Sequence, residues 1–370
     1  MKRILAIVLA AVMLLTCFVG CAAKETSATE AAGSASASAG TASESAKEET
    51  SAQPEQSASA SAATDDTVYK IEIGDVYAPE HIFAVALDKM AAELNEKSNG
   101  RLEVTTFHNS TLGSEKEELD AVAGGTLTMA IAGGGQIGTM YAPMLVFDAP
   151  YAIQSSDHLQ AVMSSDVGAE LVDGLSKQTG ISIMGALYAG KRFITTKSVA
   201  VYKPDDLKGL KIRVPDQPLS IANFKAFGAS PTPMAFSEVY LALQQGVVDG
   251  QENPLTQIMS AKFYEVQDYI STTGHVTQCV FLIANQAFLD SLPDDLRQLV
   301  TETAAEFCKS ASETSVQFES DTLKSLETDY KMTVCGADVD AFKALAASVI
   351  TEYASNWGEG LYERVQALAK

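Results

Sequence analysis

The chain has 370 residues, of which 46% are hydrophobic and 20% are charged. That is enough apolar material for two globular domains with their own cores. The formal net charge of −21 argues against a nucleic-acid partner, because duplex binding needs Lys and Arg side chains that neutralise phosphates. An acidic protein binds an anion only where cations are gathered locally, so individual arginines become candidates.

The N-terminus has the pattern of an export signal. The basic start MKR is followed by the apolar run ILAIVLAAVMLLTCFVG and then by Cys21. FVGC resembles a bacterial lipobox, where the signal is cleaved and the new N-terminal cysteine receives a lipid. We therefore expect residues 1–20 to be a lipoprotein signal peptide and the lipid on Cys21 to anchor the protein to the outer face of the cytoplasmic membrane, in the periplasm or at the cell surface. An ordinary signal peptide or a membrane helix is the alternative.

The segment that follows is compositionally simple. Between Ala22 and Thr67 there is no Leu, Ile, Val, Met or aromatic residue. Such a segment cannot bury enough apolar area to offset the entropy of ordering. Residues 21–67 are therefore predicted to be a disordered tether.

The first part of the folded region alternates strands with helices. Strands are predicted at 68–75, 101–107, 127–132 and 180–188, and helices at 81–98, 114–125 and 157–176. Alternation of this kind predicts an α/β fold with a parallel sheet.

A second α/β unit is predicted between 192 and 273, with strands at 193–196, 211–214 and 246–249. The run TQCVFLIAN at 277–285 has the apolar pattern of a strand buried on both faces. A helix from 292 to about 329 would span roughly 50 Å, so we expect it to cross both units. Two more helices, at 338–355 and 358–369, complete the prediction.

The glycine-rich, histidine and cysteine motifs do not indicate a nucleotide or metal site. GGGQIG at 133–138 fits a dinucleotide fingerprint, but the prolines that follow it argue against a helix, so a flexible loop at a strand end is favoured. The histidines and cysteines have no metal-ligand spacing, and neither a metal nor another cofactor is expected. Cys279, Cys308 and Cys335 are expected to be small buried side chains, with a Cys308–Cys335 disulfide as the alternative.

The block from KPDDLKGLKIRVP through FGASPTPMAFSEVYLALQQGVVDGQENPLTQIMSAKFYEVQDY closely resembles the solute receptors of tripartite ATP-independent periplasmic (TRAP) transporters, DctP type. Weaker agreement extends through EKSNGRLEV, STLG and FDAPY. The resemblance implies a bilobed, class II type receptor without enzymatic activity, which passes an organic acid to a membrane permease. The expected first lobe is 68–189 plus 278–318, and the second is 190–277 plus 319–370.

The resemblance also implies a set of ligand-binding residues. Arg213 in KIRVP matches an arginine that forms a two-pronged salt bridge with the ligand carboxylate. Strand alternation agrees, because it sends Ile212 and Val214 to one face and Arg213 to the other. Asn253 in QENPL matches a ligand-contacting Asn. Two further residues match family positions, namely Arg192 (or its neighbour Lys191) as a second arginine and Phe236 as an aromatic that packs on the ligand or, alternatively, in the core. Asp249 and Glu252 are expected to be structural or solvated carboxylates.

Four more side chains are candidates for bonding ligand hydroxyls, namely His81, Glu115, Gln136 and Asp216. A hexuronate or related sugar acid is the first expected ligand. A four-carbon dicarboxylate is the second, with Arg192 supplying the additional cation. Two alternatives from other classes are a secreted hydrolase that uses Asp249 and Glu252 as an acid pair and a structural surface lipoprotein.

Overall fold

The computed structural model describes residues 67–369. The predicted signal peptide, the lipidation of Cys21 and the tether as far as residue 66 lie outside the described residues. Within 67–369, no helix is both long enough and apolar enough to cross a membrane.

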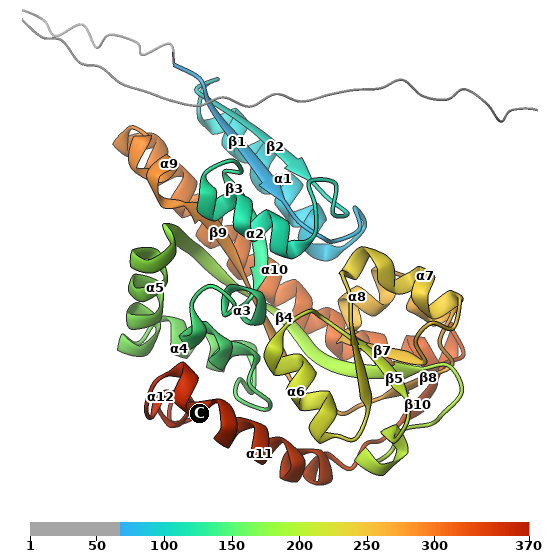
Figure 1. Cartoon of the computed structure of the whole chain (residues 1–370). Helices are drawn as coiled ribbons and strands as arrows, with labels where there is room; N and C mark the ends of the chain where they lie inside the picture. The colour runs from blue at the N-terminus through green and yellow to red at the C-terminus, as the bar shows by residue number, and fades with distance from the viewer. Residues whose placement is uncertain (1–66, 370) are drawn as a thin grey trace, which may run out of the picture. The chain divides into compact units, whose positions relative to one another are not determined.

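The described residues form ten strands (Figure 1). These are β1 (Tyr69–Gly74), β2 (Leu102–Phe107), β3 (Met129–Gly133), β4 (Ile181–Thr196), β5 (Lys211–Val214), β6 (Ser230–Pro233), β7 (Gly250–Pro254), β8 (Tyr269–Ser271), β9 (Thr277–Asn285) and β10 (Thr333–Cys335). The helices are α1 (Ile82–Lys97), α2 (Glu115–Gly124), α3 (Gly134–Ile137), α4 (Ser156–Met163), α5 (Asp166–Thr179), α6 (Pro218–Ala226), α7 (Val239–Gln244), α8 (Leu255–Ser260), α9 (Gln286–Ser291), α10 (Asp294–Thr328), α11 (Val339–Trp357) and α12 (Leu361–Gln366).

Two mixed sheets share strand β4. The strand order is β2-β1-β3-β9-β4-β7-β5-β6, and β8 pairs with both β4 and β10. In the first sheet β1 is parallel to β2 and β3, whereas β9 is antiparallel to β3 and β4. In the second sheet β5 is parallel to β6 and β7, and β4 is antiparallel to β7. Both sheets contain the predicted parallel strands, and each also carries antiparallel partners.

Strand β9 is buried on both faces, as its continuous apolar run predicts. Val280 and Leu282 enter one core cluster with α1 and the first part of α10. Phe281 and Ile283 enter another with α4 and α5. Alternate side chains of a strand point to opposite faces, so this one strand supports two cores.

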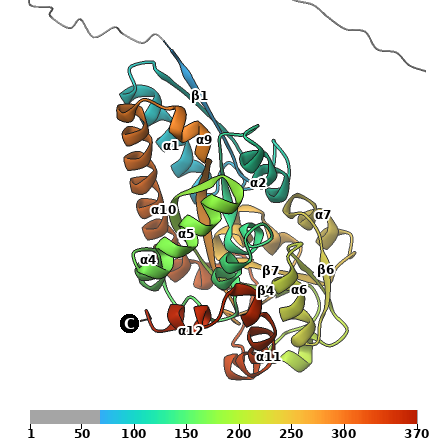
Figure 2. The same cartoon turned by 60° about the vertical axis from the view of Figure 1, so that its left-hand side comes forward.

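The long predicted helix is present as α10, and Figures 1 and 2 show it beside β4. Leu296 and Phe307 pack in a core of the first sheet, while Leu326 packs with residues of the second. α10 therefore contributes apolar side chains to both. The C-terminal helices also divide their contacts: Phe342 of α11 packs with the second sheet, but Leu361 of α12 packs with the first.

Strand β4 differs from the prediction of two separate strands at 180–188 and 193–196. It is one strand of 16 residues, with register shifts against β9 at Ile183/Gly185 and at Tyr188/Gly190. Gly190, with the basic pair that follows it, interrupts the apolar pattern, which is why the sequence predicts two strands. The shifts let one strand leave the first sheet and join the second.

The strand predicted at 246–249 was wrong. These residues form a turn, with Gly246 at φ 69° and Val247 half exposed, and the strand is the next segment, Gly250–Pro254. The helix predicted at 157–176 is two helices, because Ser165 caps a new helix by accepting from the backbone N–H of Gly168.

The glycine motif at 133–138 is not a flexible loop. Gly134–Ile137 form one buried helical turn, α3, directly after β3. Cys279, Cys308 and Cys335 are buried and free, so the alternative disulfide between Cys308 and Cys335 is absent.

Candidate ligand-binding site

A cavity of about 200 Å³ is lined by residues of both sheets and of the helices beside them. This size suits a small organic molecule. Polar side chains dominate the lining.

Arg213 lies in β5 and is only 3% exposed. Ile212 and Val214 enter the core on the opposite face, as alternation predicts. The Nε and Nη2 atoms both donate to the carbonyl oxygen of Met234, at 3.1 and 2.7 Å. Among the described residues the arginine ion pairs involve other arginines, so this guanidinium has no carboxylate partner.

A buried cation without a counter-ion is energetically costly. Burial lowers the pKa of Arg213 to about 10, although the charge of Glu252 partly offsets this effect. Arg213 lines the cavity, and among the described residues its Nη1 has no acceptor, so the guanidinium is available to a planar carboxylate. Arg213 is therefore the natural anchor for an anion.

Arg192 lines the same cavity but is already paired. Its Nη2 donates to Oε1 and to the backbone carbonyl of Glu252, each at 2.7 Å, and its Nε donates to Oε2. Its Nη1 donates to Oε1 of Gln278. The guanidinium thus has protein acceptors on all three nitrogens, and it offers little to a ligand.

Glu252 is held by a second partner, His275. Its Oε2 lies 3.1 Å from Nε2 of His275, whose Nδ1 lies 2.9 Å from Oγ1 of Thr273. Burial alone would raise the pKa of Glu252, but the charge of Arg192 and the hydrogen bonds from both partners outweigh it and bring the pKa to about 2. Glu252 is therefore ionised at neutral pH and serves to fix Arg192.

Asn253 follows Glu252 in β7, a strand whose five residues are all buried. Its Oδ1 accepts from Nη2 of Arg192 at 3.2 Å, and its Nδ2 donates to Gln251. The next residue, Pro254, restricts Asn253 to extended backbone. The side chain is thereby held at the cavity wall, where its remaining N–H can meet a ligand.

The wall formed by β3 and α3 depends on glycine. The N–H of Gly133 donates to Oε1 of Glu115 at 2.6 Å. A Cβ on Gly135 would lie 2.7 Å from Oδ2 of Asp148 and would also collide with Gln217. The absence of side chains here lets these polar groups approach one another and border the cavity.

Two lining carboxylates, Glu115 and Asp148, have raised pKa values. Burial is the main cause for both. For Glu115, the N–H of Gly133 and the arginine charges offset part of the effect. For Asp148 the pKa reaches about 6, since Arg192 offsets burial while Glu252 and Glu115 oppose ionisation.

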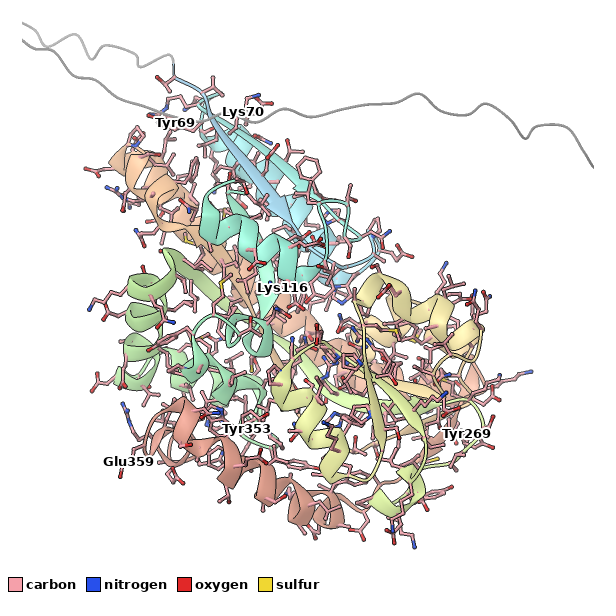
Figure 3. All side chains as sticks on the ribbon, in the orientation of Figure 1. Tyr69, Lys70, Lys116, Tyr269, Tyr353 and Glu359 are labelled. Atoms are coloured by element: carbon pink, nitrogen blue, oxygen red, sulfur yellow. The ribbon has the colours of Figure 1, made fainter. Side chains whose placement is uncertain are left out.

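The mouth of the cavity is more open to water. Asp216 is exposed, and Lys116 at the start of α2 donates to Asp120 at 2.6 Å (Figure 3). The Cζ of Arg213 lies 6.0 Å from the ring centroid of Phe236, within reach of a cation–π contact. Phe236 thus covers one side of the anchor.

The structure brings together seven of the eight predicted candidates. The seven that line the cavity are Arg213, Asn253, Arg192, Phe236, Asp216, Gln136 and Glu115. The eighth, His81, is elsewhere: it caps α1 by accepting from the N–H of Phe83, and its ring stacks 4.2 Å from that of Tyr77.

Sequence reasoning missed seven polar lining residues, namely Ser114, Lys116, Asp148, Gln217, Ser220, Gln257 and Gln278. One of them had a visible signal: Gln278 is the single polar side chain within the apolar run of β9 before Asn285, apart from its terminal Thr. Asp148 looked like an ordinary acid between hydrophobic residues in FDAPY.

The two carboxylates of the hydrolase alternative do not form an acid pair. Asp249 is exposed, and its Oδ2 accepts the backbone N–H of Lys211 at 2.8 Å. Glu252 is buried against Arg192 and His275. Asp249 does not line the cavity, so the carboxylates cannot act on one substrate.

The cavity is lined by two α/β units and contains a buried arginine without a carboxylate partner. This arrangement is typical of a protein that binds a small molecule. A family model described as bacterial extracellular solute-binding protein, family 7 (DctP) matches residues 73–356. The chain belongs to this family, as its sequence resemblance predicted.

Individual relatives agree with the family match. The 2,3-diketo-L-gulonate-binding periplasmic protein YiaO of Escherichia coli is 34% identical over 222 residues, covering 60% of this chain and 67% of that protein. A TRAP solute-binding protein of Roseobacter denitrificans, solved with L-galactonate, is 31% identical with a TM-score of 0.75, covering 81% of this chain and 98% of that one.

A second solved structure extends the range of ligands. A TRAP solute-binding protein of Sulfurospirillum deleyianum with bound succinate is 29% identical, with a TM-score of 0.77 over 82% of this chain and all of that one. These relatives confirm the α/β fold class. They are ligand-binding transport receptors and not enzymes, which confirms the corresponding prediction.

Proposed function

We propose that this protein captures a small organic acid anion in the cavity beside Arg213 and delivers it to the membrane permease of a TRAP transporter. The carrying observation is the buried guanidinium of Arg213, which faces the cavity without an ion-pair partner. A ligand carboxylate would restore the missing charge and accept the free N–H groups. Asn253 would donate to the same ligand, and Phe236 would cover it.

A sugar acid such as a hexuronate is the first ligand class, and a four-carbon dicarboxylate is the second. Both classes are found in family members, with L-galactonate in one solved relative and succinate in another. The cavity volume of about 200 Å³ accommodates acids of this size.

Capture is proposed to involve closure of two lobes, 68–189 plus 278–318 and 190–277 plus 319–370. Residues from both sides line the cavity, including Glu115 and Gln136 from the first and Arg213 and Asn253 from the second. The mature protein is proposed to be tethered through the lipid on Cys21 to the outer face of the membrane, where the permease lies. The support for this tether is the sequence pattern at 1–21.

The test is calorimetric titration of residues 67–370 with D-galacturonate, galactonate and succinate, together with mass spectrometry of any acid that copurifies. We expect at least one acid to bind without being chemically changed. Arg213→Ala should weaken that binding by about 2–5 kcal/mol, because it removes a buried, charged contact. Near-native affinity in this variant would refute the site, and turnover of a bound acid would refute the receptor function.

A further inference from the structure

The charges around the cavity are asymmetric. Arg213 is the one lining arginine, among the described residues, that lacks a carboxylate partner, since Arg192 is paired with Glu252. The lining also contains Asp148 and Glu115, neither of which has an ion-pair partner there. Lys116, the other cation of the lining, is exposed and paired with Asp120. The buried part of the cavity can therefore neutralise one ligand carboxylate, and a second would lie near carboxylates of the protein.

Asp148 is nearly without donors. The hydroxyl of Ser220 donates weakly to its Oδ2, at 3.4 Å, and also lies 3.4 Å from Oε1 of Gln217. Asp148 lines the cavity, and Gly135, which has no Cβ, lets its Oδ2 approach the backbone closely. An ionised carboxylate can only accept hydrogen bonds, so this wall requires a donor from the ligand.

Two glutamine side chains that line the cavity each have one buried amide atom without a hydrogen-bond partner. Nε2 of Gln136 and Oε1 of Gln257 are both completely buried without a hydrogen bond, in side chains that are 5% exposed. Buried polar groups of native proteins are almost always bonded, and both residues line the cavity, so a ligand there is a candidate partner for each amide. One needs an acceptor and the other a donor, and a hydroxyl is both.

We propose that Asp148, with Ser220 and Gln217, forms a hydroxyl-binding subsite that selects a polyhydroxylated monocarboxylate and rejects a dicarboxylate. The ligand carboxylate binds Arg213, and hydroxyls further along the ligand donate to Asp148 and bond the free amides of Gln136 and Gln257. A carboxylate in the position of those hydroxyls would have no proton to donate and would be repelled. The inference rests on the proposed function and decides between its two ligand classes.

The pKa of Asp148, raised to about 6 by burial, gives the subsite a pH dependence. The charged and titratable groups that face it are Arg192, Glu252, Glu115 and His275. Only the ionised carboxylate is an acceptor on both oxygens. Affinity for a hydroxylated monocarboxylate should therefore increase as the pH rises through about 6, and affinity for a dicarboxylate should decrease.

The experiment uses two matched six-carbon acids, galactonate and galactarate, which differ only in whether the far end is a hydroxymethyl group or a second carboxylate. Succinate is a third ligand without hydroxyls. Each is titrated calorimetrically into the wild type and into Asp148→Asn. We expect the wild type to prefer galactonate, and Asp148→Asn to bind it roughly tenfold less tightly, since an uncharged acceptor forms the weaker hydrogen bond. In Asp148→Asn, the ratio of the galactonate affinity to the affinities for galactarate and succinate should decrease by at least the same factor.

The control is Asp157→Asn, which removes an exposed carboxylate from the first turn of α4. It should leave all three affinities unchanged. Thermal unfolding without ligand checks that Asp148→Asn is folded, and Asp148→Ser provides a second variant if it is not. The galactonate affinity of the wild type should be higher at about pH 8 than at about pH 5, whereas that of Asp148→Asn should be the same at both pH values.

The outcomes separate this inference from the proposed function. If the wild type binds succinate or galactarate more tightly than galactonate, or if Asp148→Asn leaves the preference unchanged, the subsite is refuted while the receptor function stands. If Arg213→Ala retains the affinity of whichever acid binds, the anchor and the proposed site fail together. If none of the three acids binds to the wild type, the inferred ligand class is refuted.

Discussion

Arg192 and Glu252 lie on the neighbouring antiparallel strands β4 and β7, where the guanidinium donates to both carboxylate oxygens. The pair is buried, with side chains 7% and 3% exposed. Glu252 therefore neutralises the charge of Arg192, while the charge of Arg213 has no carboxylate partner. Two arginines of one cavity thus have different roles: one joins the strands that form the wall, and the other is available to a ligand.

Replacement of Glu252 by Gln should destabilise the protein strongly. Arg192 would then be a buried cation without a counter-ion, which costs about 3–5 kcal/mol of unfolding free energy. Urea unfolding of the ligand-free protein measures the change. The matched control is Glu103→Gln, whose partner Lys70 lies 3.3 Å away at an exposed site. That change should cost less than about 1 kcal/mol, and similar losses in the two variants would contradict the role assigned to the buried pair.

Asp249→Asn should affect stability but not ligand affinity. Asp249 joins the turn before β7 to the start of β5, since its Oδ2 accepts the N–H of Lys211 and its own N–H donates to the carbonyl of Lys211, both at 2.8 Å. An Asn side chain keeps a weaker version of the first bond, so we expect a loss of about 0.5–1.5 kcal/mol. Calorimetry with a bound acid should give the wild-type affinity. A tenfold loss of affinity would revive the idea of a functional carboxylate pair.

The sequence predicted elements well where the apolar pattern is continuous. The run at β9 and the long uninterrupted helix α10 are examples, because each buries the side chains that its pattern indicates, although each contributes to two cores. The sequence predicted elements poorly where the pattern is interrupted. The polar segment that begins at Gly190 made β4 look like two strands, and the β-branched residues Val247 and Val248 suggested a strand in what is a turn.

Apolar periodicity also fails to predict the polar residues of the candidate site. Strand β7 is GQENP, and its polar side chains are buried because they are hydrogen-bonded: Asn253 bonds Gln251, and Glu252 bonds Arg192. Of these side chains, that of Asn253 lines the cavity. No rule of apolar periodicity selects such a strand, and local rules are expected to fail at functional sites. Arg213 and Asn253 could be predicted because they belong to a recognisable motif. The pairing of Arg192 with Glu252, and the close approach of Gly135 to Asp148, depend on contacts between segments that are separated in the sequence.

Glu118 should make the stability of the protein depend on pH. Both of its carboxylate oxygens are buried without a partner. Burial is the main cause that raises its pKa to about 8, and the charges of Asp75, Glu115 and Glu117 add to it. The folded state therefore holds a proton that the unfolded state loses above its ordinary pKa near 4.5. Stability should fall as the pH rises from about 4.5 to about 8, by up to about 1.4 kcal/mol per pH unit.

Glu118→Gln removes this titration and should flatten the pH dependence of the urea midpoint across that window. At about pH 8 the variant should equal or exceed the wild type in stability. Glu96→Gln, at an exposed position of α1, is the matched control and should keep the wild-type slope. An unchanged slope in Glu118→Gln would show that another group holds the proton.

Gly190→Ala should destabilise the protein at the place where β4 passes from one sheet to the other. Gly190 has φ 103°, in the region that favours glycine, and a Cβ there would lie 2.9 Å from Oε2 of Glu319. That oxygen accepts from the hydroxyl of Tyr188 at 2.8 Å and from the N–H of Lys191 at 3.0 Å. The substitution adds backbone strain and disturbs both hydrogen bonds, so we expect a loss of about 1–3 kcal/mol.

The control for this change is Gly336→Ala, at an exposed glycine where a Cβ would have nothing within 4 Å. There the added methyl group restricts the unfolded chain without a clash, so stability should stay the same or rise slightly. Urea unfolding measures both variants. Equal stability of the two would mean that β4 can relax at Gly190 without Glu319. A selective loss at Gly190 would show that the contact between α10 and β4 fixes the crossing strand, and with it the wall that carries Arg192.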